Sequence, residues 1–141
     1  MSDIAALIDR QAVADVMSTY AACIDERDSA RYRALFRDDV EVVGFAREAL
    51  TGIEAWQAFV NAQLDRFRTT QHMLGPLLAR VEGDRADART DLQATHWMRE
   101  PEDAVFTLWG TYETEMVRDP AGEHGWKIAR HALVLRGTEG P

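Results

Sequence analysis

Apolar residues in the first half of the chain recur every three or four positions, which is the spacing of one face of an α-helix. This pattern predicts a long amphipathic helix over Ile4–Ile24 and a short second helix, with Asp28 as its N-cap, that runs through Leu35. A third helix is expected to begin at Thr51-Gly52. Its apolar face is predicted to hold Ile53, Trp56, Phe59, Val60, Leu64 and Phe67.

The period of the apolar residues changes to that of strands after His72, and turn residues separate the segments. A short β-branched run predicts an earlier strand over Val40–Phe45. Four later strands are expected over Leu77–Glu82, Ala86–Met98, Val105–Val117 and Trp126–Arg136, with turns at Gly83-Asp84 and Asp119–Gly122. Early helices and late strands are typical of an α+β domain, in which helices pack on one face of an antiparallel sheet.

Alternation along the last predicted strand indicates which side chains share a face. Lys127, Ala129, His131, Leu133 and Leu135 would lie on one face, and Trp126, Ile128 and Arg130 on the other. Both faces then carry apolar residues, as expected when one face of a sheet is buried against another subunit. We therefore predict a homodimer or homotrimer.

Length and charge narrow the possible classes of function. The 141 residues are expected to form one domain, residues 1–141, around a single core. A formal net charge of −8 argues against binding to nucleic acid or to an anionic membrane surface. No apolar run approaches the length of a membrane span, and no export signal is visible, so we expect a cytoplasmic protein with a reduced Cys23.

Motifs that would hold a metal or an organic cofactor are absent from the sequence. There is no HExxH or His-x-His pattern, no glycine-rich phosphate loop and no Gly-x-Ser-x-Gly nucleophile turn. Candidate chemistry therefore rests on single side chains. Tyr20 and Asp25 lie about 140° apart on an ideal helix, so both reach one cavity only if the helix end bends. The residues by themselves have commoner interpretations. Tyr20 is then a core tyrosine, Asp25 part of a solvated helix end, and His96 and His131 structural histidines in strands.

Six segments in order give the chain a resemblance to the SnoaL-like branch of the NTF2-like superfamily. They are Tyr20–Asp28, Leu35–Val40, Thr51–Trp56, Thr69–His72, Gly83–Ala88 and Gly125–Ile128. Within that branch the chain is most similar to scytalone dehydratase, bile-acid 7α-dehydratase and hexachlorocyclohexane dehydrochlorinase. The resemblance implies a cone-shaped barrel, with a curved, mostly antiparallel sheet covered by three helices and a deep pocket that holds an Asp–His pair.

The resemblance also implies roles for individual residues. His72 matches the family's general base and Asp25 the carboxylate that orients it. Tyr20 matches a tyrosine of the bile-acid dehydratase, where the dehydrochlorinase carries a lysine, which favours loss of water over loss of halide. His96 lies near the position of a second cavity histidine in scytalone dehydratase. Either His131 or, with a one-residue shift, Arg130 takes the place of the dehydrochlorinase's pocket arginine.

The function expected from this resemblance is a cofactor-independent lyase that acts on an apolar cyclic compound. The alternatives are a non-catalytic small-molecule-binding protein and an isomerase or cyclase of the same fold. The pocket wall is predicted to hold Phe45, Trp56 and Trp109, with Phe59, Leu74, Leu92 and Leu133 as further candidates. A highly charged substrate is not expected, because the sequence indicates no basic group at the pocket beyond Arg130 or a protonated histidine.

Overall fold

The computed structural model describes residues 2–141, which form three helices and one six-stranded sheet. The helices are α1 (Asp3–Glu26), α2 (Ser29–Arg33) and α3 (Ile53–Leu64); the strands are β1 (Phe36–Val43), β2 (Leu50–Thr51), β3 (Phe67–Glu82), β4 (Arg85–Met98), β5 (Val105–Arg118) and β6 (Trp126–Glu139). The strand order is β2-β1-β6-β5-β4-β3. Among the described strands only β1 and β6 pair in parallel, so the predicted α+β fold with a mostly antiparallel sheet is confirmed.

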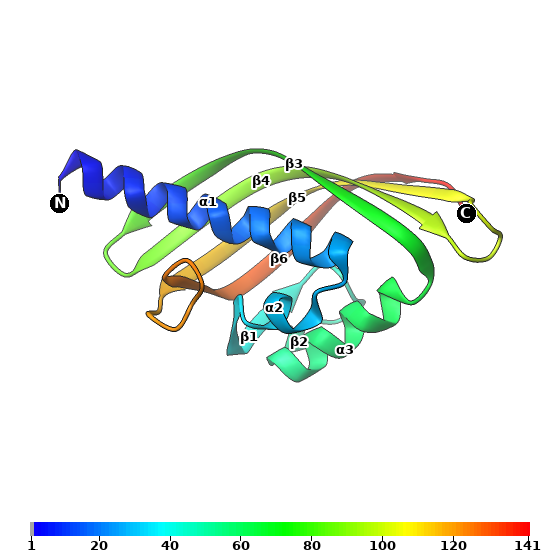
Figure 1. Ribbon diagram of the computed structural model, residues 1–141, viewed down its shortest axis with the longest axis horizontal. Coiled ribbons are helices and arrows are strands. Elements are labelled where there is room, and N and C mark those ends of the chain that lie inside the picture. The colour runs from blue at the N-terminus through cyan, green and yellow to red at the C-terminus, as the bar shows by residue number, and fades with distance from the viewer. Residues whose placement is uncertain (1) are drawn as a thin grey trace.

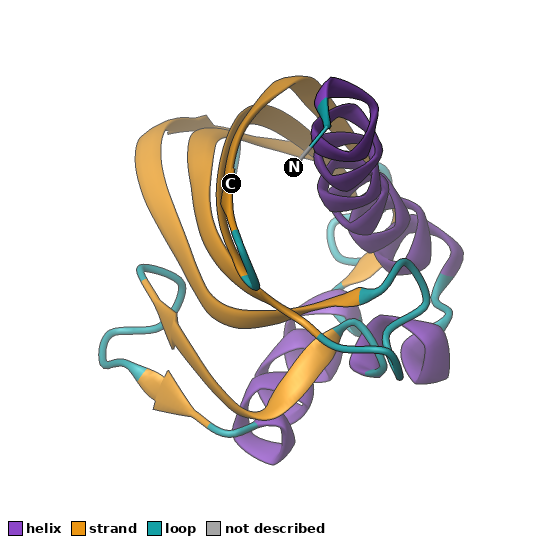
Figure 2. Ribbon diagram, turned by 90° about the vertical axis from the view of Figure 1, so that its left-hand side faces the viewer, coloured by secondary structure: helices purple, strands orange, loops and turns teal. Residues whose placement is uncertain are grey.

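The four long strands β3 to β6 curve strongly, and α1 lies along their concave side (Figure 1). Figure 2 shows the sheet curling around this side, with α1 along one edge and α3 below it. Helices on the concave side give the molecule its cone shape. As a result, side chains from both helices and from four strands can converge on the interior.

Several boundaries differ from those predicted: β3 begins at Phe67 instead of Leu77, and β1 spans Phe36–Val43 instead of Val40–Phe45. Two of the differences affect the site. Helix α3 ends at Leu64, and Phe67 begins β3 because it pairs with Met98 on β4, so His72 lies inside a strand instead of before one. Strand β1 ends at Val43 because Gly44 turns the chain with a φ of 88°. A Cβ at Gly44 would lie 2.1 Å from the Leu133 carbonyl oxygen. This glycine lets Phe45 approach the sheet.

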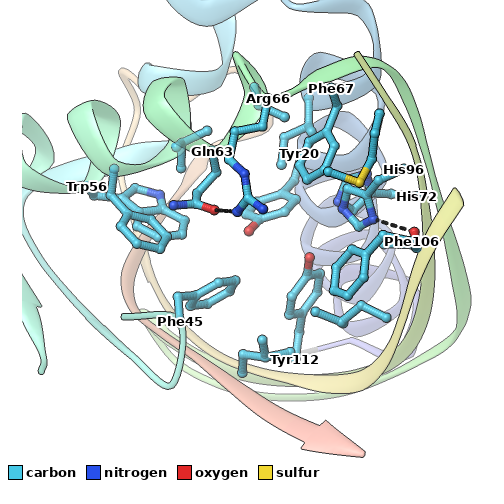
Figure 3. Close-up of a pocket in the computed structure, with 18 of the residues that line it drawn as sticks. Tyr20, Phe45, Trp56, Gln63, Arg66, Phe67, His72, His96, Phe106 and Tyr112 are labelled. Atoms are coloured by element: carbon cyan, nitrogen blue, oxygen red, sulfur yellow. Dashed lines mark hydrogen bonds between the residues drawn. The ribbon is translucent and has the colours of Figure 1, made fainter. Parts of the chain in front are cut away.

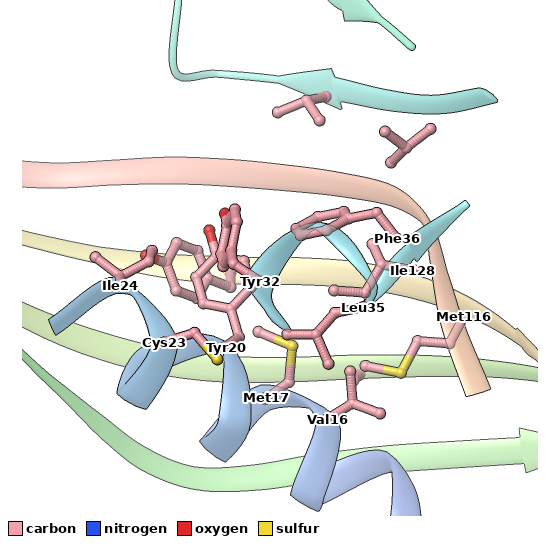
Figure 4. Close-up of a cluster of buried hydrophobic side chains, with 14 of the residues drawn as sticks. Val16, Met17, Tyr20, Cys23, Ile24, Tyr32, Leu35, Phe36, Met116 and Ile128 are labelled. Carbon is pink, nitrogen blue, oxygen red and sulfur yellow. The ribbon is translucent and has the colours of Figure 1, made fainter. Parts of the chain in front are cut away.

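The hydrophobic core lies between α1, α2 and the concave face of the sheet (Figure 4). Its central residues are Val16, Met17, Tyr20, Cys23, Ile24, Tyr32, Leu35, Phe36, Met116 and Ile128, all 7% exposed or less. Burial of this apolar surface stabilises the fold by roughly 25 cal/mol per Å² removed from water. Tyr20 and Ile24 reach beyond the core into the neighbouring cavity, so the core supports one wall of that cavity.

A β-bulge in β6 changes the alternation that the sequence predicts. Met116 pairs with Ile128 but Glu115 pairs with Arg130, so Ala129 is the extra residue. Ile128 before the bulge and His131 after it are therefore both fully buried, and Arg130 is left on the outer face. The predicted opposition between His131 and Ile128 is wrong for this reason.

The outer, convex face of the sheet combines ion pairs with a few exposed apolar residues. Met73 is 62% and Leu78 65% exposed, and Arg80 pairs with Glu82. These exposed side chains are compatible with contact between subunits, and the homodimer or homotrimer stays a prediction. No helix within residues 2–141 combines the length and apolar character needed to cross a lipid bilayer.

Candidate active site

The concave side of the sheet holds a cavity of about 280 Å³, enclosed by α1, α3 and the strands β3 to β6. Its walls are mainly apolar and aromatic, and its polar groups are two histidines, two tyrosines, a glutamine and an arginine (Figure 3). The lining residues are Tyr20, Ile24, Phe45, Trp56, Phe59, Val60, Gln63, Leu64, Arg66, Phe67, His72, Ala94, His96, Met98, Phe106, Leu108, Tyr112, Leu133 and Pro141. An apolar wall with a few polar groups is typical of a small-molecule site.

Asp25 and His72 form a close pair at one wall of this cavity. Asp25 Oδ1 lies 2.8 Å from His72 Nδ1, and Asp25 Oδ2 accepts the backbone N–H of His72 at 2.8 Å. Asp25 follows the end of the apolar face of α1 and points at β3, whereas His72 faces the cavity. The helix therefore need not bend, because Asp25 lies behind His72 and reaches the cavity only through it.

A second pair of residues lies behind Asp25. The Thr70 hydroxyl donates to Asp25 Oδ1 at 3.0 Å and accepts a hydrogen bond from Arg27 Nη1 at 3.0 Å. Burial alone would raise the pKa of the Asp25 carboxyl, but hydrogen bonds from the ring and backbone N–H of His72, the ring's charge and the Thr70 hydroxyl outweigh this effect and lower it. Asp25 is therefore a carboxylate at neutral pH.

The ionised Asp25 determines which nitrogen of His72 carries the proton. A carboxylate only accepts hydrogen bonds, so His72 Nδ1 must be the N–H that donates to it. In the neutral ring, Nε2 then holds an unshared electron pair. The His72 side chain is only 8% exposed and its ring lines the cavity, so this pair can act as a base toward a bound molecule.

His96 lies beside His72 on the neighbouring strand β4 and is fixed in the same tautomer. The two ring centroids are 5.8 Å apart, and His96 Nδ1 donates to the carbonyl oxygen of Phe106 at 3.1 Å. Burial lowers the pKa of His96 to about 4, so the ring is neutral. Its Nε2 is then a hydrogen-bond acceptor, which suits a hydroxyl or N–H group of a ligand and does not suit a carbonyl oxygen.

Three tyrosines and His131 form a buried polar cluster, of which Tyr20 and Tyr112 belong to the cavity wall and Tyr32 and His131 lie behind it. His131 is fully buried, with Nε2 2.9 Å from the Tyr20 hydroxyl and Nδ1 2.9 Å from Thr114 Oγ1. Tyr32 and Tyr112 pack against Tyr20 with ring centroids 5.1 and 5.3 Å away. Burial raises the pKa of all three phenols well above 10, so each stays protonated. The hydroxyls of Tyr20 and Tyr112 point into the cavity (Figure 3).

Several predicted site residues lie elsewhere. Arg130 is on the outer face, where its Nε donates to Glu41 Oε1 at 3.0 Å, because the bulge in β6 turns it away from the interior. Trp109 alternates with the cavity-lining Leu108 and is 37% exposed outside the cavity. Both nitrogens of His131 are already hydrogen-bonded, so it positions Tyr20 instead of contacting a ligand. Leu74 and Leu92 pack in the core beside the cavity without lining it.

The structure also adds cavity residues that the sequence did not single out. Tyr112 is an inward residue of β5, and Gln63 and Arg66 lie where α3 passes into β3. The alternation Leu108, Gly110, Tyr112 could have indicated the tyrosine. Gln63 and Arg66 carried no such signal, since the predicted helix continued through Phe67. Among residues 2–141 no group of three His, Cys, Asp or Glu side chains lies close enough to hold a metal ion.

Comparison with solved structures finds the same fold in proteins named for elimination reactions. A candidate scytalone dehydratase from Novosphingobium aromaticivorans is 24% identical, with a TM-score of 0.86 over 96% of this chain and 89% of that one. The type 2 hexachlorocyclohexane dehydrochlorinase is 20% identical, with a TM-score of 0.85 over 99% and 93%. The type 3 enzyme from Novosphingobium barchaimii is also 20% identical, with a TM-score of 0.84 over 99% and 94%.

These identities establish a common fold and leave the reaction of this chain to be argued from its own site. No curated protein matches the sequence. A family model described as a SnoaL-like domain matches residues 5–132, which include α2, α3, all but the first two residues of α1, Asp25, His72 and most of the sheet. The chain therefore belongs to the SnoaL-like domain family.

Proposed function

We propose that the protein is a cofactor-independent lyase that removes water from a small, mostly apolar cyclic compound. The observation that carries this proposal is the Asp25–His72 pair, whose free Nε2 faces an apolar cavity. Two solved structures of the same fold are named for dehydratase and dehydrochlorinase activity, and they support this proposal by analogy. The proposed reaction needs a base on one side of the ligand and hydrogen-bond donors on the other.

His72 is the proposed base. Its Nε2 takes a proton from a carbon next to a carbonyl group, and the electron pair of that C–H bond moves toward the carbonyl. The ring then carries a positive charge, which Asp25 stabilises at 2.8 Å in a largely buried setting. Because the carboxylate also holds the backbone N–H of His72, the ring keeps its orientation during proton transfer.

The phenols of Tyr20 and Tyr112 are the proposed donors. One donates a hydrogen bond to the carbonyl oxygen as negative charge develops there, and the other protonates the departing hydroxide as the C–O bond breaks. A carbon–carbon double bond forms and one water leaves. The proton on His72 then returns, through solvent, to the phenolate. These donors favour loss of water over loss of halide. A departing hydroxide needs a proton, which a tyrosine supplies, whereas a halide ion leaves without one.

The cavity wall defines the rest of the ligand. Phe45, Trp56 and Phe59 form an aromatic side, with Trp56 lying between the other two at centroid distances of 4.8 and 5.8 Å. A ring compound buried there gains roughly 25 cal/mol per Å² of apolar surface taken from water. A volume of about 280 Å³ is close to the lower end of the range for ligand pockets, which favours a compact ligand.

The experiment separates proton abstraction from elimination. Purified protein is incubated in heavy water with tetralone, a bicyclic ketone, and deuterium entering next to its carbonyl is followed by NMR. The β-hydroxy derivative of tetralone is tested in parallel, since its loss of water produces fluorescent naphthol. We expect both signals with the native chain and neither with His72→Ala.

The matched control is His124→Ala, which removes a histidine held by Thr19 and Glu123 outside the cavity. Its exchange and dehydration rates should equal those of the native chain. Deuterium exchange without naphthol would indicate an isomerase. Saturable binding of tetralone with neither signal would contradict the lyase proposal and leave the binding protein as the function.

A further inference from the structure

We propose that the ligand of this cavity carries one carboxylate, which Arg66 binds at the cavity entrance while the ring lies against the aromatic wall. The choice of site rests on the proposed function, and the inference adds the charge of the ligand. It also revises the expectation from sequence that a charged substrate is disfavoured. The basic group at the cavity is Arg66, which lies in the segment between α3 and β3.

Neighbouring residues hold Arg66 over the cavity. Its Nη1 donates to Gln63 Oε1 at 3.2 Å, and its guanidinium carbon lies 5.6 Å from the centre of the Phe67 ring. Gln63 and Phe67 also line the cavity. Figure 3 shows the guanidinium group directed inward between Gln63 and Tyr20. Arg66 is exposed to solvent, and its contacts with Gln63 and Phe67 leave most of its N–H groups free for a ligand.

The charge of Arg66 has no carboxylate partner within ion-pair distance among residues 2–141. Arg68, two residues further along, differs, because its Nη2 lies 2.9 Å from Asp103 Oδ1. Arg27 and Arg99 lie nearby, and neither has a carboxylate partner within ion-pair distance in the described chain. The backbone N–H of Arg99 donates to the backbone carbonyl of Arg66 at 3.3 Å. Burial lowers the pKa of Arg27, and the charge of Arg99 lowers it further. The charges of Asp25 and Asp65 act in the opposite direction but do not outweigh burial. Against the carboxylates of Asp25 and Asp65, the three arginines at this end of the cavity leave an excess of one positive charge, in a chain of net charge −8.

The chemistry of the lining selects a carboxylate. A guanidinium group presents a planar fork of N–H donors that matches the two oxygens of a carboxylate. Arg66 is the one cationic side chain among the lining residues, and His96 is neutral with an acceptor nitrogen facing the cavity. One negative charge at the entrance is therefore matched, whereas a second charge deeper in the cavity would meet apolar rings. A cyclic monocarboxylic acid fits this arrangement.

The test measures equilibrium binding of naphthoate and of its uncharged amide, naphthamide, by isothermal titration calorimetry at low salt. The two probes share ring and shape and differ in charge. We expect the native chain to bind naphthoate about tenfold more tightly than naphthamide, which corresponds to about 1.4 kcal/mol. Arg66→Gln should reduce naphthoate affinity about tenfold and change naphthamide affinity less than about twofold.

Arg68→Gln is the matched control, since Arg68 lies in the same segment but pairs with Asp103. It should keep the preference for naphthoate. Equal affinities of the two probes for the native chain, the same preference in Arg66→Gln, or no saturable binding of naphthoate would each overturn the proposal. Naphthoate carries no leaving group and its binding is measured without turnover, so this result does not depend on whether the protein catalyses elimination.

Discussion

The two oxygens of the Asp25 carboxylate hold His72 at two points, the ring Nδ1 and the backbone nitrogen, each at 2.8 Å. This relationship joins the end of α1 to the middle of β3 and fixes both the position and the tautomer of one side chain. It also explains why Asp25 lies outside the cavity. In the proposed reaction the role of Asp25 is to hold the base, and of the two residues only His72 lines the cavity.

Asp25→Asn should abolish most of the activity while the protein stays folded. An amide N–H of the new side chain donates to His72 Nδ1, which places the ring proton on Nε2 and removes the base. We expect kcat for dehydration of the tetralone derivative to fall by about 10² to 10⁴, as in other Asp–His pairs. Circular dichroism should show an unchanged fold, and Asp87→Asn on the outer face should keep full activity. Normal turnover in Asp25→Asn would contradict the proposed base.

Tyr112→Phe and Tyr20→Phe should each slow dehydration by about 10- to 10³-fold with little change in ligand affinity. Each removes one O–H donor whose bond strengthens as charge develops on the ligand. The matched control is Tyr32→Phe, since Tyr32 belongs to the same buried cluster but accepts from Trp56 Nε1 and does not line the cavity. Its kcat should stay within about threefold of the native value. A larger loss in Tyr32→Phe than in Tyr112→Phe would argue against the assigned donors.

The stability of the protein should fall as the pH is lowered from 6.5. Burial lowers the pKa of His131 to about 3, so the folded chain keeps this ring neutral while the unfolded chain protonates it near pH 6.5. The unfolded state therefore binds more protons below pH 6.5, and the free energy of unfolding decreases by up to about 1.4 kcal/mol per pH unit. By pH 5 the loss from His131 should be about 2 kcal/mol.

Urea unfolding between pH 5 and 8 measures this slope. His131→Gln, whose amide can bond to Tyr20 and Thr114, should flatten it. His96→Asn should flatten it as well, because the pKa of His96 is lowered to about 4. The lowered pKa of Asp25 contributes stability that is lost only at more acidic pH, below the ordinary carboxyl range, so it does not interfere. An unchanged slope in His131→Gln would mean that the ring is protonated in the folded state.

Gly44→Ala should destabilise the fold and displace Phe45 from the cavity wall. Gly44 has a φ of 88°, and a Cβ there would lie 2.1 Å from the Leu133 carbonyl oxygen. Backbone strain and this clash together should cost about 2–4 kcal/mol in urea unfolding. Gly83→Ala is the matched control, because Gly83 also has a positive φ, 58°, but nothing within 4 Å. Its cost should be about 1 kcal/mol, and equal losses in the two variants would show that the clash is relieved.

The sequence by itself determined the main elements and the pair at the centre of the site. Helical spacing placed the first helix over Ile4–Ile24, within one to two residues of α1, because an amphipathic helix carries its burial pattern in local periodicity. The turn at Gly83-Asp84, strand β4 and the Leu77–Glu82 part of β3 followed for the same reason, while the first ten residues of β3 were not predicted as a strand. Asp25 and His72 came from the family resemblance, since 47 positions separate them and no local pattern relates them.

Only the tertiary structure decided which side chains face the cavity. A strand with strict alternation would have placed Ile128 and Arg130 together, but the extra residue Ala129 reverses the order and brings His131 inside. Such a bulge depends on pairing with β5, which the sequence of β6 does not contain. The direction of Arg66 also depends on strand pairing. Helical periodicity continued through Phe67, and the pairing of Phe67 with Met98 ended the helix and turned Arg66 toward the cavity. Local patterns determine the elements because they depend on neighbours along the chain, whereas register and orientation depend on partners that only the folded sheet brings together.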